Sequence, residues 1–243
     1  MNNHNEFILK PITDILKDVV SASIGISDGI ETYPLCDYIM QSVFLKMTGF
    51  QEQKMKCISW ELATNDYDYR RTLLTNEDRL GECSTYGDKS KIYKRLIEQI
   101  CNYDSTFDVK SIDKKSIRKG TTLNIKSIFS NTNLLIWGQS DFNEYENIWK
   151  VVTSNHFATE NTNLFVENKT FSLIDIYSNH LYKRRNRIAH NTHSYQQNLP
   201  TLKTLSNENY IYENYFLWFA ILVLIDEIFR VLYKKYLDLI EEN

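Results

Sequence analysis

The chain has 243 residues, enough for a domain with a sizeable core, and its 42% hydrophobic and 24% charged residues are typical of a globular protein. It contains 7 Gly and 3 Pro residues, so tight turns are few and the composition favours long helices over many short strands. The net charge of −3 excludes a globally basic nucleic-acid-binding protein, so any contact with nucleic acid must come from a local patch.

The four cysteines are widely separated, which argues against a zinc site. Cys36, Cys57, Cys83 and Cys101 include no Cys-x-x-Cys pair. Scattered cysteines of this kind are typical of reduced thiols in a cytosolic protein. Residues 1–6 lack the basic-then-apolar order of a signal peptide. We therefore expect a cytoplasmic protein with no bound metal and no cofactor.

The N-terminal part of the chain predicts a series of amphipathic helices behind a short tail. Residues 1–10 are expected to be the tail, and apolar residues recur at helical spacing over 11–20. After a polar connection, Pro34 opens a strong helix and Gly49 ends it. The same apolar spacing then continues over residues 51–64, which predicts a separate helix.

The middle of the chain gives a less uniform pattern. Residues 91–102 predict an amphipathic helix. Residues 103–135 show the weakest secondary-structure pattern in the chain. The apolar residues over 123–129 fit either a helix or a short strand. A further helix is expected over 141–157, with Asp141 as its cap and aromatic residues along one side.

Two short apolar runs follow, and they leave two alternatives open. Residues 164–166 and 169–171 fit a small β-hairpin around Glu167 and Asn168, or else a helix begins near Phe171. From there, apolar residues at helical spacing run on to residue 190.

The last predicted helix, residues 208–239, is apolar almost all round near its middle. Such a helix must be covered on every side, either at the centre of a bundle or in a dimer interface. The run 215–225 is too short to span a bilayer, so we expect no contact with a membrane. Asp226 and Glu227 close it, and they either face a basic segment of a partner copy or simply interrupt the apolar surface. With no internal repeat and no domain boundary, we predict a single all-α domain over 1–243.

A dense cluster of positive charge lies directly before a pair of histidines. The cations are Lys183, Arg184, Arg185 and Arg187, and the residues after them include His190, Asn191 and His193. Phosphodiester cleavage needs cations that balance charge developing on the phosphate, and a group that moves protons near neutral pH. Arginine suits the first task and histidine the second.

Helical geometry limits how these residues can act together. On a continuous helix Arg185 and His190 lie about 140° apart, so they converge only if the helix ends or bends between them, or if they come from opposite protomers. Arg184, Arg187 and Asn191 share one face, which either follows a phosphate backbone or is simply solvated.

The segment Arg185-Asn186-x-x-x-His190 resembles the R-x(4–6)-H motif of HEPN domains, in which a polar residue often follows the arginine. The context is also similar, because the motif lies late in the chain and a long apolar helix follows it. The HEPN-like part covers roughly residues 140–240. The resemblance implies a helical bundle that forms a homodimer, with two copies of the motif facing each other across a cleft.

The resemblance also implies an activity. HEPN ribonucleases act in toxin–antitoxin, phage-defence and CRISPR-associated systems, which would make RNA the substrate and an antitoxin or defence-system protein a partner. His190 would act as general base or acid, Arg185 would stabilise the transition state and Asn186 would orient a neighbour. The residues expected to bind RNA are Lys183, Arg184, Arg187, Asn191 and His193.

The expected reaction is metal-independent and uses the RNA's own 2′-hydroxyl as nucleophile, giving a 2′,3′-cyclic phosphate and a 5′-hydroxyl end. Two alternatives stay open. One is a non-catalytic HEPN module that binds RNA, a nucleotide or a partner protein. The other is a helical structural protein without an active site.

Overall fold

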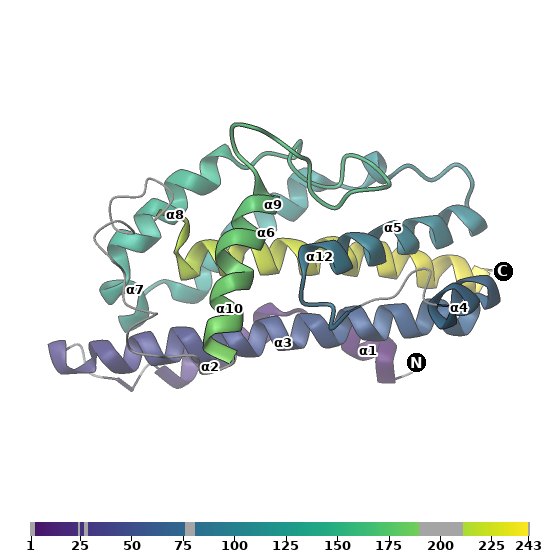
Figure 1. The fold of residues 1–243 in the computed structure, drawn as a ribbon. Helices are drawn as coiled ribbons and strands as arrows, with labels where there is room; N and C mark the ends of the chain where they lie inside the picture. The colour runs from purple at the N-terminus through teal and green to yellow at the C-terminus, as the bar shows by residue number, and fades with distance from the viewer. Residues whose placement is uncertain (1–2, 24, 27–28, 76–80, 190–210, 243) are drawn as a thin grey trace.

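The computed structural model describes residues 3–23, 25–26, 29–75, 81–189 and 211–242, and within these ranges the fold is built from helices (Figure 1). No strand occurs in this part of the chain, so the all-α prediction is confirmed. The helices are α1 (Asn3–Leu9), α2 (Thr13–Ser23), α3 (Tyr33–Asn65), α4 (Tyr67–Leu74), α5 (Tyr86–Tyr103), α6 (Lys114–Phe129), α7 (Asn133–Trp137), α8 (Gln139–Val151), α9 (Leu173–Asp175), α10 (Tyr182–Ala189) and α12 (Tyr215–Glu242). Shorter elements are the 3₁₀ turns η1 (Ile30–Thr32) and η2 (Val109–Ser111) and the π-helical turn η3 (Ile176–Leu181).

Helix α12 is the central element of the bundle. It contacts α1, α3, α5, α6 and α8, and every residue over 216–226 is buried. Figure 1 shows α12 running between α3 on one side and α5 and α6 on the other. The bundle-centre alternative is therefore correct for this helix, and its apolar surface gives no argument for a dimer. The described helix begins at Tyr215, and residues 208–210 lie outside the described residues.

Helix α3 is continuous over 33 residues, so the prediction that Gly49 ends a helix is wrong. Glycine costs about 1 kcal/mol in a helix interior relative to alanine. Here Met47, Thr48 and Gln51 on both sides of it are buried, and the Gln51 amide donates to the carbonyl of Leu222 on α12 at 2.9 Å. Tertiary packing on both sides of the glycine outweighs its low helix propensity.

The N-terminal segment is a packed helix, so the predicted tail over residues 1–10 is wrong for residues 3–9. Ile8 is 1% exposed. The segment is held by what we call the N-terminal clamp, formed by Lys10, Ile12, Lys54 and Asp226. The Asp226 carboxylate accepts from the Ile12 amide at 2.9 Å and from Lys54 Nζ at 2.6 Å, and Lys54 Nζ also donates to the Lys10 carbonyl.

The clamp also decides between the two alternatives for Asp226. Both Lys54 and Asp226 have side chains only 1% exposed, so Asp226 is an internal ion-pair partner and does not face a second copy of the chain. Burial raises the pKa of Asp226 and lowers the pKa of Lys54, and the contact between the two charges opposes both shifts. Glu227 is bonded to Arg230 on the same helix at 2.5 Å.

The segment between α8 and α9 contains no hairpin, so that alternative is wrong. A single antiparallel bridge joins Phe157 to Phe165, and the two buried rings belong to the hydrophobic core. The helix alternative is correct, since α9 begins at Leu173 behind a Ser172 cap. The predicted helix over 141–157 runs instead over Gln139–Val151 and is preceded by Gly138 in place of Asp141.

Residues 123–129 lie in α6, so the helix alternative holds there as well.

Of the helices that the structure describes, none combines the length and the apolar character needed to cross a membrane.

Candidate functional site

Helix α10, which carries the basic segment, is set at a steep angle across α3 (Figure 1). It continues directly from η3, where Tyr177 and Leu181 are buried at 2% and 1% exposure. A π-helical turn holds one more residue than an α-helical turn, and such turns are frequent at functional sites. The buried residues of η3 anchor α10, and the next turn presents Arg184 and Arg185, both half-buried.

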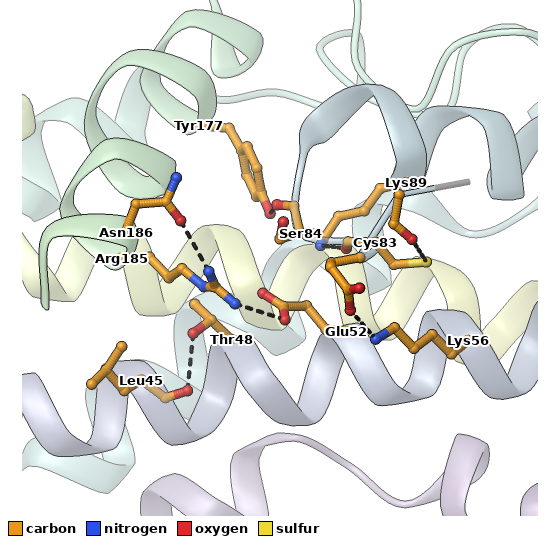
Figure 2. Close-up of polar contacts among 12 residues, drawn as sticks. Leu45, Thr48, Glu52, Lys56, Cys83, Ser84, Lys89, Tyr177, Arg185 and Asn186 are labelled. Atoms are coloured by element: carbon orange, nitrogen blue, oxygen red, sulfur yellow. Dashed lines mark hydrogen bonds and ion pairs between the residues drawn. The ribbon is translucent and has the colours of Figure 1, made fainter. Parts of the chain in front are cut away.

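The guanidinium of Arg185 is held from two sides (Figure 2). Its Nη2 lies 2.9 Å from Glu52 Oε2 on α3, and its Nη1 donates to Asn186 Oδ1 at 2.9 Å. The side chains of Arg185 and Glu52 are 21% and 11% exposed, so the ion pair is largely shielded from water. The structure thus brings together the first two residues of the motif and fixes the arginine with charge-assisted hydrogen bonds.

Glu52 is a site residue that the sequence analysis missed. It lies 133 residues before Arg185, and nothing local predicts that contact. One signal was present, because Glu52 sits four residues after Thr48 and three before Met55, and both of these are buried. A carboxylate on the buried side of a helix needs a partner, so its position alone calls for a cation from elsewhere in the chain.

A second cation lies behind Glu52. Lys89 on α5 is 1% exposed, donates to the Cys83 carbonyl at 2.6 Å and lies 5.5 Å from the centre of the Tyr177 ring. Burial lowers the pKa of Lys89 to about 8, and the nearby Glu52 carboxylate opposes that shift. The Tyr177 hydroxyl donates to the Ser84 carbonyl at 2.8 Å. The loop before α5 is therefore tied to both α5 and η3 next to the candidate site.

The basic residues of α10 that were predicted to bind phosphate do not all point to solvent. Arg184 turns inward, and its Nη2 lies 3.3 Å from the Tyr215 hydroxyl at the start of α12. Lys183 and Arg187 are exposed. One turn before Arg184, His180 Nδ1 lies 2.8 Å from Glu213 Oε1. Among the basic residues described on α10, Lys183 and Arg187 are thus the exposed ones.

The described part of α10 ends at Ala189, one residue before His190. His190, Asn191 and His193 lie outside the described residues. The predicted convergence of Arg185 with His190, and the face shared with Asn191, therefore stay predictions.

Comparison of the chain with protein-family models, with curated proteins and with solved structures gives no match. Among the residues that the structure describes, no three His, Cys, Asp or Glu side chains gather as a metal site would require. All four cysteines are free thiols, and Cys36 and Cys83 are buried.

Proposed function

We propose that the protein is a metal-independent endoribonuclease of HEPN type, which cleaves RNA to 2′,3′-cyclic phosphate and 5′-hydroxyl ends. The observation that carries this proposal is the double anchoring of Arg185 by Glu52 and Asn186, at the first position of a motif that ends in His190. The two contacts hold the guanidinium in one place, as a cation that stabilises a transition state has to be held.

The anchored arginine fits the electrostatic task of the reaction. Guanidinium has five N–H donors, and two contacts within the chain leave others for a phosphate oxygen. A cation that is already fixed needs little reorganisation when negative charge develops in the transition state. Asn186 acts as the positioning residue because its side-chain oxygen holds one arm of the guanidinium.

His190 supplies the proton transfer in this proposal. The 2′-oxygen attacks phosphorus while the bond from phosphorus to the 5′-oxygen breaks, so one proton leaves the 2′-hydroxyl and one reaches the 5′-oxygen. Imidazole titrates near neutral pH and can serve as base in the first transfer or as acid in the second. Because the attacking group belongs to the RNA, DNA is not a substrate.

The biological setting follows from the HEPN resemblance alone. On that ground we infer a toxin or phage-defence effector, active as a homodimer and associated with an antitoxin or another defence-system protein. The cytoplasmic location is inferred separately, from the scattered cysteines.

The proposal is tested with purified protein and a mixed-sequence RNA, with and without EDTA. We expect cleavage in both conditions, with cyclic phosphate ends, and none with DNA of the same sequence. A His190→Ala variant is expected to lose cleavage and to retain its helical circular dichroism spectrum, because residues as polar as those around His190 seldom form a core. Intact RNA after incubation with the wild type, or full activity in folded His190→Ala, would refute the assignment.

The two arginines beside the motif are expected to differ in their effect on RNA binding. Arg187→Gln should flatten the salt dependence of binding by about 0.7 in the log–log slope, because an exposed cation that contacts a single-stranded phosphate releases a counterion. Arg184→Gln should change this slope less, because its guanidinium is turned toward Tyr215. Fluorescence anisotropy over a salt series measures both slopes. Equal slopes in the two variants would show that the inward position of Arg184 does not matter.

A non-catalytic HEPN module that binds RNA, a nucleotide or a partner protein is the second candidate. The observation that favours it is that Arg184 and Arg185 both have partners within the chain, as structural residues do. Binding of RNA without cleavage would support it, and the absence of both binding and cleavage would favour a helical structural protein.

A further inference from the structure

Positive charge also gathers on α6, far from the motif in sequence. Residues 110–126 contain six Lys or Arg residues and one Asp, in a chain whose net charge is −3. From the sequence alone this stretch has no clear secondary structure, so its charges could not be assigned to one face. The structure now gives it a regular helical arrangement.

Three of these lysines form a line along the outer face of α6. Lys115, Lys119 and Lys126 are exposed, and at 100° per residue they fall within a sector of about 40° around the helix axis. The line is about 16 Å long at 1.5 Å per residue. No described carboxylate pairs with Lys115 or Lys119, whereas Lys126 Nζ lies 3.5 Å from Glu146 Oε1 on α8.

Helix α8 adds a fourth lysine to this surface. α6 and α8 lie side by side and antiparallel, because Thr122 bonds to Trp149 at 3.0 Å while Lys126 pairs with Glu146. Lys150 is exposed and lies one turn after Glu146, the partner of Lys126, on the same face of α8. We call Lys115, Lys119, Lys126 and Lys150 the lysine ridge.

The ridge stands on a rigid base. Arg118, on the flank of α6 that faces α8, donates to the backbone carbonyls of Trp149 and Val152 and so fastens the end of α8 to α6. Beneath the ridge, Ile125 and Phe129 are fully buried. The lysines therefore project from two helices whose relative position is fixed.

We propose that the lysine ridge is a second RNA-binding surface, which holds the phosphate backbone of the substrate outside the cleavage site. This inference rests on the proposed function for the identity of the polyanion. A stacked strand carries one phosphate per 3.4 Å of axis, so the ridge is long enough for about five nucleotides. Lysine acts as a point charge, so the ridge binds the backbone and does not read the bases.

The test compares two variants that lose the same charge. Lys115→Gln/Lys119→Gln removes the unpaired half of the ridge, and Lys91→Gln/Lys234→Gln removes two exposed lysines from α5 and α12. The probe is a fluorescent 2′-O-methyl oligonucleotide of mixed sequence, which has no free 2′-hydroxyl and is not cleaved. Anisotropy titrations over a salt series give the affinity and its salt dependence.

We expect the ridge variant to lower the log–log salt slope by about 1.4, since each lost contact with a single-stranded phosphate removes about 0.7. The control variant should stay close to the wild type. Equal slopes in the two variants would overturn the proposal. So would a competition experiment in which polyglutamate displaces the labelled oligonucleotide as well as unlabelled RNA does, because the ridge would then bind an acidic protein equally well.

The same measurements separate this proposal from the proposed function. If the wild type cleaves RNA and the ridge variant binds normally, the ridge proposal fails and the ribonuclease stands. If the wild type binds through the ridge and cleaves no RNA, the ridge stands and the catalytic assignment fails.

Discussion

Replacing Arg185 by glutamine is expected to slow RNA cleavage about 100- to 1000-fold, the usual cost of losing one preorganised donor to the transition state. The guanidinium is already fixed by Glu52 and Asn186, so its remaining N–H donors need little reorganisation when the phosphate gains charge. Single-turnover cleavage of an end-labelled RNA measures the chemical step directly.

The control for this variant has to separate chemistry from folding. Arg185→Gln leaves Glu52 largely buried without its cation, which by itself destabilises the protein. The double variant Glu52→Gln/Arg185→Gln removes both charges and should recover much of that stability. We expect it to be folded in thermal denaturation and still inactive. Recovery of cleavage in the double variant would show that Arg185 serves the structure and not the reaction.

Replacing Asp226 by alanine is expected to lower the free energy of unfolding by about 3–5 kcal/mol, the range found when one partner of a buried ion pair is removed. The variant would leave Lys54 Nζ and the Ile12 amide without the carboxylate that now accepts from both. Urea denaturation followed by circular dichroism gives the change in free energy and also shows whether the slope of the transition is preserved.

Two comparisons make this prediction specific. Lys94→Ala, which breaks an exposed pair with Glu98 on α5, should cost about 0.5 kcal/mol. Lys54→Met/Asp226→Leu should recover most of the stability, because apolar side chains of similar volume often replace a buried pair without loss. A loss below about 1 kcal/mol in Asp226→Ala would contradict a structural role for the N-terminal clamp.

The helices of this bundle are largely predictable because they repeat apolar residues at helical spacing. The aromatic side of α8 illustrates this, since Phe142, Tyr145 and Trp149 are buried as the spacing predicts. The errors occur where packing with distant residues decides the local structure. Gly49 has the properties of a helix end, yet it stays helical because α12 covers its neighbours.

The candidate site likewise contains residues that the local sequence predicts and one that it does not. The motif predicts Arg185 and Asn186 as site residues because they are adjacent in the sequence, and their side chains are hydrogen-bonded in the structure. Glu52 lies 133 residues away from Arg185 and could be found only as an acid without a local partner. The π-helical turn before α10 has no signal in the sequence, because the apolar residues around it keep the spacing of an ordinary α-helix.

The position of α12 has a consequence for how the chain folds during synthesis. Helix α12, against which α1, α3, α5, α6 and α8 pack, is synthesised after all five of them, and the Asp226 contact with Ile12 spans 214 residues. The apolar faces of α3, α5, α6 and α8 are therefore synthesised before α12 is available to cover them. Contacts of such long sequence separation fold slowly and leave apolar surface exposed to aggregation or to chaperones. Translation speed before residue 215 should thus affect the yield of folded protein.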